Sequence, residues 1–482
     1  MALLPRAPSP VESPVAIGTK VELDEQVTLL DRDLLTGGSP WRLLRLAGGS
    51  RRVLERWRGG GEVLAGEERF ARTLVQQGLV HPHFVNQVDV DDVDVIIPVR
   101  DDVASLRVLL AQLVGFHVTV VDDGSLNHSM IEDCARQFDV SLVTLEENRG
   151  PGAARNAGVA ATSRPMLWFL DADVTIDSPT DVVARLGAEI SDPLVGAVAP
   201  RIRGGAGSSI RDRFERRFSP LDMGERGGLV VPGAAVGYVP SACLLVRRAS
   251  FGEGFDEDLR CGEDVDLIWR LVDQGWLVRY DASVTVIHRA RGTWRHWWNQ
   301  RVGYGESASD LAARHPDRLA PIRLDAWTTI AWGAALAGRP GWSAQIVRAA
   351  RANFHSRVAD STEDPSRVTR EVVARNMVRT GAPLARAIVR TFGLVVLASA
   401  LHPRLRRRAL VLFTVGTAWR WRTTRLHVSD VPLAIADDVA YAVGVYRGAW
   451  RTKTLGALKP HFTKSSIGLR DVLGLRTTST DA

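Results

Sequence analysis

The feature that most constrains the fold is an alternation of strand-like and helix-like segments that begins at Asp91. The apolar runs VDVIIPV, HVTVV, VSLVTL and MLWFL have the length of buried strands, and the segments SLRVLLAQLV and GAARNAGVAATS have helical spacing. Apolar strands that alternate with helices are typical of a parallel sheet with helices on both faces. The sequence therefore predicts an α/β sandwich, in which ligands bind at the carboxyl ends of the strands.

Two loops that carry carboxylates follow these strands. VDDGS places Asp122 and Asp123 after one strand, and FLDADV places Asp171 and Asp173 after another, with Ala172 between them. Alternate residues at a strand end point the same way, so the second pair suits a hard divalent cation, Mg2+ or Mn2+. An ordinary Asp-Gly turn in the first loop and a capped acidic turn in the second are the simpler alternatives.

Two other segments begin helices with residues suited to chemistry. NRGPGAARNAG is a Gly-rich loop that opens a helix, whose N-terminus favours anions, and Arg155 lies in its first turns. CGEDVDLIWR begins a second helix with Glu263 and Asp264, either of which can accept a proton from a hydroxyl. Helix capping alone would also explain these carboxylates.

The segments that follow add a histidine and a cluster of aromatic and basic residues. His288 ends the strand-like VTVIH and can complete a metal site or contact a diphosphate, although a structural role is the alternative. WRHWWNQRVGYG comes next and contains Arg301. This segment suits sugar stacking and phosphate pairing, and a helix that packs its tryptophans inward explains it equally well.

Taken together, these segments resemble the family 2 glycosyltransferases of the GT-A fold. From about Val93 to Tyr304, the motifs DVIIPVRDD, VDDGS, NRGPGAARNAG, FLDADV and GED occur in the order found in that family. The resemblance implies transfer of a sugar from a UDP-sugar to a hydroxyl acceptor, with inversion at the anomeric carbon. WWNQRVGYG departs from the QxxRW motif of processive members, so synthesis of long polymers is not expected.

The resemblance also implies roles for the matching residues. Asp264 is expected to be the catalytic base, supported by Glu263, and Asp171 and Asp173 correspond to the metal-binding DxD pair, with His288 as an additional metal ligand. Arg301 lies in WRHWWNQRVGYG and is expected to bind the donor as well. The full set of residues expected to bind the donor is Pro98, Val99, Asp122, Asp123, Arg155, Asp171 and Arg301.

The length of 482 residues predicts two or three domains. We expect a disordered Pro/Ser-rich tail over 1–18, a small α+β unit over 19–85, the transferase over 91–315 and a helical, Arg-rich region over 316–482. In the small unit, VELDEQVTLLD and WRLLRLAGG are predicted strands, and RRVLERW and EERFARTLVQQG are predicted helices. This order suggests a winged-helix-like module and resembles the PqqD-type peptide-recognition domains.

The whole chain resembles a narrower group, the glycosyltransferases of the mycofactocin system. The resemblance rests on the N-terminal unit, on YGESASDLAARHP and on the Arg-rich C-terminal region. It implies a glucose donor and an acceptor that is a peptide-derived redox cofactor. Three alternatives stay open: a lipid or cell-envelope polysaccharide acceptor, a nucleotidyltransferase, and a regulator that binds nucleic acid, which the carboxylate-rich loops disfavour.

The basic residues are concentrated near the C-terminus. No Asp or Glu occurs from Pro383 to Arg425, a stretch that suits an anionic membrane surface, although a solvated helical face is the alternative. FGLVVLASALH, from Phe392, is too short to span a bilayer and is predicted to be buried or interfacial, with a transmembrane segment that extends back to Leu384 as the alternative. The arginines in this stretch are Arg386, Arg390, Arg404, Arg406, Arg407, Arg408, Arg420, Arg422 and Arg425.

The N-terminus and the cysteines indicate the compartment. MALLPRAPSPVESPV has no long apolar stretch, so a secretory signal is not expected there. The three cysteines, Cys134, Cys243 and Cys261, are far apart, so neither a disulfide framework nor a zinc site is expected. We expect a cytoplasmic protein that associates with the inner face of the membrane.

Overall fold

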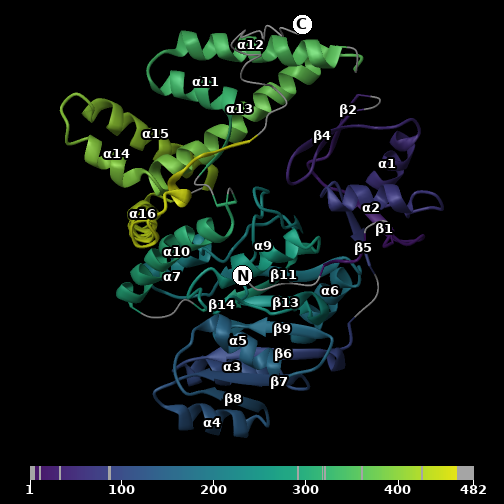
Figure 1. The fold of residues 1–482 in the computed structure, drawn as a ribbon, viewed down its shortest axis with the longest axis vertical. Coiled ribbons are helices and arrows are strands. Elements are labelled where there is room, and N and C mark those ends of the chain that lie inside the picture. Colours follow the sequence, from purple (N-terminus) through teal and green to yellow (C-terminus); the bar gives the residue numbers. More distant parts are fainter. Residues whose placement is uncertain are drawn as a thin grey trace, which may run out of the picture. The chain divides into compact units, whose positions relative to one another are not determined.

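The structure is a computed structural model that describes residues 6–9, 12–31, 34–84, 88–289, 293–316, 318–319, 322–359, 362–424 and 427–463. The chain divides into two compact units (Figure 1). Met1–Thr28 and Thr36–Gly292 form the first, and Leu29–Leu35 and Thr293–Ala482 form the second. The domain boundaries expected from the sequence stay a prediction.

A nine-stranded mixed sheet is the centre of the first unit, in the order β10-β14-β11-β13-β9-β6-β7-β8, with β12 paired to β14. The strands β8, β7, β6 and β9 are parallel, and so are β11 and β14, whereas β13 is antiparallel to both of its neighbours. The strands are β6 (Val93–Val99), β7 (His117–Asp123), β8 (Ser141–Leu145), β9 (Met166–Leu170), β10 (Val174–Thr175), β11 (Val195–Gly204), β12 (Gly228–Leu229), β13 (Cys243–Arg247) and β14 (Leu277–His288).

Helices connect these strands and cover the sheet, so the predicted α/β architecture with a mostly parallel sheet is confirmed. Helix α5 packs closely on the sheet, because a Cβ atom at Gly158 would lie 2.5 Å from the Ile96 side chain. Helix α4 was not predicted, since its apolar positions Ile131, Cys134 and Ala135 form only a short buried stripe. The helices are α3 (Val103–Gln112), α4 (His128–Gln137), α5 (Pro151–Ala160), α6 (Pro179–Ile190), α7 (Ile210–Phe218), α8 (Arg248–Phe251) and α9 (Glu263–Asp273), with the 3-10 turn η1 (Val90–Asp92).

The N-terminal segment forms two small sheets and two helices. Strands β1 and β5 pair antiparallel, and β2, β3 and β4 form a three-stranded sheet with β4 at one edge. The winged-helix-like interpretation of this unit stays a prediction. The elements are β1 (Lys20–Leu23), β2 (Thr28–Asp31), β3 (Leu34–Gly37), β4 (Arg42–Arg45), α1 (Ser50–Arg58), α2 (Glu68–Gln76) and β5 (Val80–His83).

The single strand expected over VELDEQVTLLD is wrong, because this segment contains β1 and β2. The Asp24 carboxylate accepts a hydrogen bond from the Gln26 N–H at 2.9 Å and closes a turn between the two strands. Strand β5 was also missed, since its VHPH sequence contains Pro82. Proline removes a hydrogen-bond donor and therefore argues against a strand in a sequence-based prediction.

A buried ion pair joins the N-terminal segment to the turn between α6 and β11. The Arg72 guanidinium of α2 donates to both carboxylate oxygens of Asp192, at 2.7 and 3.0 Å, and its Nε donates to the Ser13 carbonyl at 2.6 Å. Such a two-pronged pair fixes orientation as well as distance. Within the segment 1–18, expected to be a disordered tail, Ser13 and Val15 are buried.

The second unit is helical, which confirms the helical C-terminal region predicted from the sequence. Helices α10 and α16 pack closely, because a Cβ atom at Gly305 would clash with the Tyr441 carbonyl oxygen. The elements are α10 (Trp294–Arg314), α11 (Ala326–Leu336), α12 (Pro340–Val358), α13 (Pro365–Arg390), α14 (Gly393–Ser399), α15 (Arg406–Thr424), α16 (Val431–Thr452), the 3-10 turns η3 (Val428–Asp430) and η4 (Gly456–Leu458), and the paired strands β15 (Arg323–Asp325) and β16 (His461–Thr463).

Among the described residues, no single helix has both the length and the apolar composition needed to cross a membrane. Helices α13 and α14 meet those criteria only as a pair, and they are bent by 68° where they join. Of the arginines predicted to contact a membrane, Arg425 lies outside the described residues.

Candidate active site

The predicted site residues of the first unit meet at one edge of the sheet. Val99 on β6 is the register neighbour of Asp122 on β7, and Pro98 is the neighbour of Val121. Asp171 directly follows β9, and its N–H donates to the Ala242 carbonyl at 3.0 Å. The carboxyl ends of β6, β7 and β9 therefore bring these residues together, because the three strands are parallel.

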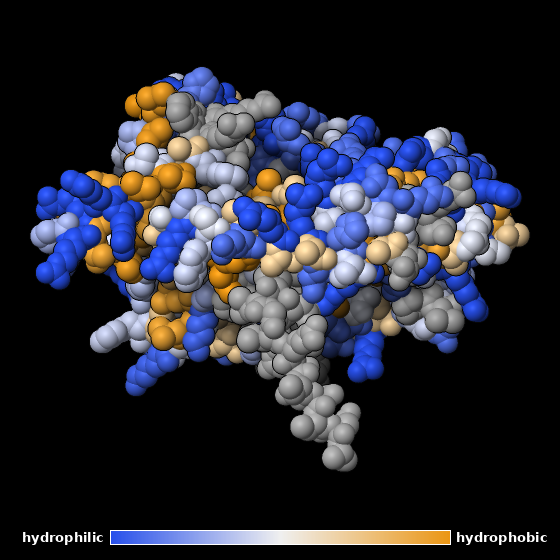
Figure 2. Space-filling view, turned by 90° about the horizontal axis from the view of Figure 1, so that it is seen from above, coloured by the Kyte–Doolittle hydropathy of each residue, from blue (hydrophilic) through white to orange (hydrophobic). Residues whose placement is uncertain are grey.

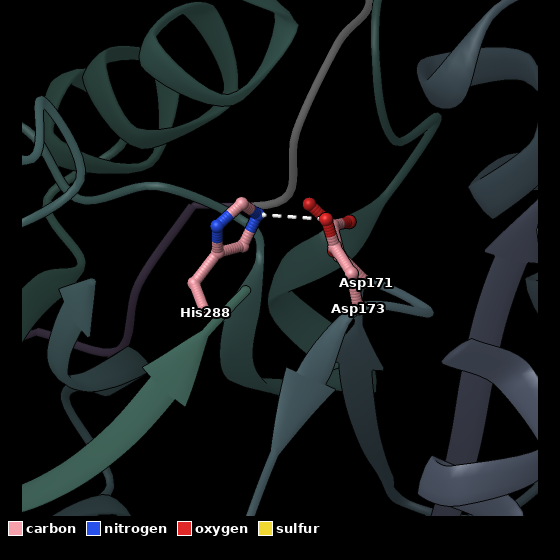
Figure 3. A group of neighbouring side chains, drawn as sticks. All are labelled: Asp171, Asp173 and His288. Atoms are coloured by element: carbon pink, nitrogen blue, oxygen red, sulfur yellow. Dashed lines mark ion pairs between the residues drawn. The ribbon is translucent and has the colours of Figure 1, made fainter. Parts of the chain in front are cut away.

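Asp171, Asp173 and His288 form a compact cluster (Figure 3). One ligand atom from each side chain lies within 4.8 Å of the others, and His288 Nε2 lies 3.2 Å from an Asp173 carboxylate oxygen. The antiparallel pairing of β10 with β14 creates the cluster, since it sets Val174 opposite His288. Two carboxylates and an imidazole are a donor set that suits Mn2+ or Mg2+.

Arg155 connects this cluster to helix α9. Its guanidinium is 3% exposed and donates to Asp171 at 2.6 Å and to Glu263 at 2.9 Å. Burial works to lower the pKa of Arg155, but the carboxylates of Asp171 and Glu263 raise it overall, so the side chain stays charged. The sequence predicted that Arg155 lies near the nucleotide, and the structure shows two carboxylates that pair with it.

Glu263 and Asp264 begin α9 at the other end of this bridge. The two carboxylate oxygens of Asp264 accept hydrogen bonds from the backbone N–H groups of Val265, at 2.8 Å, and Ser241, at 3.3 Å. Burial raises the pKa of Asp264, and burial together with the Asp264 charge raises the pKa of Glu263 to about 7. Carboxyl groups with raised pKa values beside a cluster of potential metal ligands are typical of functional sites. No sequence pattern marked Ser241, because it contributes a backbone group.

Asp122 binds its own loop, whereas Asp123 binds the loop that starts α5. Asp122 accepts from the Ser125 N–H at 3.0 Å and lies 2.7 Å from His128 Nδ1, a partner that the sequence analysis missed. Asp123 accepts from the N–H groups of Arg149, at 2.7 Å, and Gly150, at 3.0 Å, and so closes the loop that starts α5. The turn alternative accounts for the contact between Asp122 and Ser125 but not for those of Asp123, and the donor-binding role of both residues stays a prediction.

Arg301 lies in the second unit, on α10. It is buried, its Nε donates to Asp437 of α16 at 2.8 Å, and its guanidinium lies 5.2 Å from the Trp297 ring centroid. These contacts join two helices of the second unit, as expected if the tryptophan packs inward. Its predicted contact with the donor stays a prediction.

Comparisons with known proteins identify the family. The model described as Glycosyl transferase family 2 matches residues 94–255. A relative from Mycobacterium tuberculosis, called pre-mycofactocin glycosyltransferase, is 35% identical over 463 residues, which cover 92% of this chain and 97% of the relative. The chain belongs to the family 2 glycosyltransferases, and it is a nucleotide-sugar-dependent glycosyltransferase. Within that family, it resembles the pre-mycofactocin glycosyltransferase over nearly its whole length.

Other similarities cover less or are weaker. The N-acetylglucosaminyl-diphospho-decaprenol L-rhamnosyltransferase of Mycobacterium tuberculosis is 30% identical over 230 residues, which are 41% of this chain and 71% of the relative. A mannosyltransferase from Pyrobaculum calidifontis, solved with GDP-Man and Mn2+, aligns with 77% of this chain and 91% of its own, at 16% identity and a TM-score of 0.43.

Proposed function

We propose that this enzyme transfers glucose from UDP-glucose, with inversion, to a hydroxyl of a peptide-derived redox cofactor, in mycofactocin biosynthesis. One observation carries the chemistry: Arg155 ties the Asp171–Asp173–His288 cluster to the carboxyl pair at the start of α9. A donor diphosphate and an acceptor hydroxyl would then meet in one place. The similarity to the pre-mycofactocin glycosyltransferase supports the acceptor.

Asp171, Asp173 and His288 would hold a Mg2+ or Mn2+ ion. When bound, the ion supplies a positive charge that stabilises the departing diphosphate. The protein's part is to keep Asp173 buried against His288 and to leave Asp171 29% exposed toward the donor. Pro98, Val99, Asp122 and Asp123 would line the nucleoside pocket on the neighbouring strands.

Asp264 serves as the general base. Two backbone N–H groups donate hydrogen bonds to its carboxylate and fix its orientation. The carboxylate can still accept a proton from the acceptor hydroxyl. As the acceptor oxygen bonds to the anomeric carbon, its proton passes to Asp264 and the bond to the diphosphate breaks. This single displacement inverts the anomeric carbon and needs no covalent sugar intermediate. Glu263, which is paired with Arg155, would support this base from the neighbouring position.

The small N-terminal unit would capture the peptide part of the acceptor. Strand β4 is an edge strand, so an extended peptide can add to it through backbone hydrogen bonds. Leu43 and Leu44 in β4 are half-buried, and Trp41 precedes the strand. Capture there would raise the effective concentration of acceptor near Asp264.

Two proline variants test capture by β4. Leu43→Pro and Leu44→Pro remove alternate N–H groups, of which only one points away from β3. The variant that removes the outward group should raise KM for the peptide acceptor several-fold and leave donor hydrolysis and the melting temperature unchanged. If neither variant changes acceptor KM while both stay folded, β4 is not the capture strand.

Mass spectrometry of the acceptor tests the whole proposal. Purified enzyme, UDP-glucose, a divalent cation and the peptide-derived acceptor should give products heavier by a few hexose units, with UDP released. Release of pyrophosphate instead would identify a nucleotidyltransferase. An acceptor pool that is unchanged between cells with and without the protein would contradict the proposed acceptor.

A lipid-linked sugar is the second candidate acceptor. Part of the chain is similar to a protein whose name specifies a diphospho-decaprenol acceptor. We also propose that the enzyme is cytoplasmic and works at the inner face of an anionic membrane, where such an acceptor would lie. Transfer to a diphospho-polyprenyl sugar in the same mass-spectrometric assay, with no transfer to the peptide-derived compound, would favour this candidate.

A further inference from the structure

The α14–α15 hairpin of the second unit exposes an unusual number of large apolar side chains. Helix α14, with the sequence GLVVLAS, has no polar side chain before its last residue, Ser399. Such a helix is normally buried in a core or in a membrane, yet Val395 is 54% exposed and Leu401, just after α14, is 81% exposed. The other exposed apolar residues of the hairpin are Leu397, Leu405, Leu410, Val411 and Val415.

The inner side of the hairpin is already used for packing. Gly393 and Leu394 line an apolar cavity shared with α13, α15 and α16. On α15, a Cβ atom at Gly416 would lie 2.8 Å from the Val389 side chain of α13. Leu397 also lines this cavity, whereas Val395, Leu401, Val411 and Val415 do not. These four exposed residues are therefore additional to those that line the cavity inside the unit.

Arginines surround this apolar face. Arg404, Arg406, Arg407 and Arg408 are all exposed, and the sequence contains no Asp or Glu between Glu371 and Asp430. In the part of the chain that the structure describes, Arg404, Arg407 and Arg408 form no ion pair, and Arg406 donates to the Ala400 carbonyl at 3.2 Å, which closes the connection between the helices. Arg408, Val411 and Val415 follow helical spacing and share a face of α15.

Figure 2 shows hydrophobic and hydrophilic side chains next to each other at the left edge, where α14 and α15 lie in Figure 1. Apolar side chains flanked by arginines match the boundary between acyl chains and anionic headgroups in a bilayer. A protein partner would need an apolar surface with carboxylates placed to match the arginines. A bilayer with anionic lipids supplies acyl chains and negative headgroups however the hairpin is rotated about the membrane normal.

We propose that the α14–α15 hairpin is an interfacial membrane anchor, which inserts Val395, Leu401, Val411 and Val415 among acyl chains while Arg404, Arg407 and Arg408 bind anionic headgroups. This inference rests on the membrane association proposed above and names the surface responsible for it. It does not depend on the identity of the donor or acceptor, so it can fail or hold independently of the transferase assay.

Co-sedimentation with lipid vesicles tests the anchor. The full-length protein should bind vesicles that contain phosphatidylglycerol, bind vesicles of pure phosphatidylcholine much less, and be released by high salt. Val411→Asp should lower the vesicle partition coefficient roughly tenfold, since it removes an inserted apolar side chain. Val114→Asp, which changes a side chain that is 82% exposed in the first unit, is the matched control and should have no effect.

The charge contribution has its own matched pair. Arg408→Gln should lower partition into anionic vesicles about fivefold, whereas Arg351→Gln, on an exposed position of α12, should not. Equal effects of the hairpin and control variants, or release from vesicles only by detergent, would overturn the proposal. So would a change from dimer to monomer in Val411→Asp with unaltered vesicle binding, which would identify the face as a contact between two copies of the chain.

Discussion

Each unit has a buried arginine that pairs with carboxylates, but only in the first unit is one of those carboxylates exposed enough to bind a ligand. We call the first arrangement open and the second closed. In the first unit, Arg155 joins Glu263 to Asp171, and the Asp171 side chain is 29% exposed. In the second unit, Arg301 and Arg390 converge on Asp437, whose side chain is 10% exposed. The difference teaches that a buried ion pair indicates a site when one of its carboxylates can still accept a ligand. Otherwise, the pair holds helices together.

The largest expected effect concerns the open arrangement. Asp173→Ala removes one of the three clustered ligand groups and should lower transfer about 10³-fold, because several kcal/mol of leaving-group stabilisation are lost. Steady-state kinetics with added Mn2+ or Mg2+ measures the effect. Asp177→Ala, an exposed carboxylate nearby, is the control and should leave transfer unchanged. Full wild-type activity in excess chelator would contradict the role of a metal.

The closed arrangement should respond in stability instead. Asp437→Ala leaves the buried Arg301 and the half-buried Arg390 without this partner and should lower the free energy of unfolding by about 3 kcal/mol. Chemical denaturation measures this loss, and Glu371→Ala, which removes an exposed pair with Arg367, should cost less than about 1 kcal/mol.

Kinetics of the same Asp437→Ala protein sharpen the comparison. Under conditions where it remains folded, its donor KM should equal that of the wild type. A raised donor KM would instead support the donor-binding role predicted for Arg301.

Asp264→Asn separates chemistry from binding within the first unit. Asparagine keeps the shape of the side chain but cannot take the acceptor proton, so transfer should fall about 10²-fold while donor binding is retained. Calorimetric binding of UDP and a transfer assay provide the two measurements, with Asp258→Asn as an exposed control. Nearly unchanged transfer would show that Glu263 or another group is the base.

The smallest effect is a displaced pH profile. A general base must be deprotonated, so kcat should fall as the pH drops through the pKa of Asp264, which burial raises above its ordinary value. The acid limb of kcat should therefore lie above the range of an ordinary aspartate. Transfer rates at saturating donor and acceptor across the acidic to neutral range measure it. An acid limb at or below the ordinary value would contradict the raised pKa.

Much of the transferase site was predictable because it follows local rules. Apolar runs of strand length mark β6, β7 and β9, and the residues after parallel strands must meet at one edge. This reasoning identified Asp171 and Asp173. The ordered set of motifs led to the family, and the comparisons confirmed it.

The partners of these residues were not predictable in the same way. The order of motifs placed Arg155 beside a nucleotide, but its contacts with Asp171 and Glu263 depend on how α5 and α9 pack. The backbone N–H of Ser241 has no sequence signature at all. Likewise, β13 runs antiparallel to both of its neighbours in the sheet. The spacing of apolar residues is the same in parallel and antiparallel strands, so it does not predict the direction of a strand.

The sequence by itself determined the class of fold, the family and the residue types of the site, because these depend on periodicity and on the order of short motifs. The tertiary structure decided what each charged side chain does. Arg301 and Asp437 are 136 positions apart, and only the close packing of α10 on α16 brings them within 2.8 Å. A buried charge requires a partner, and the partner is chosen by packing rather than by distance along the chain.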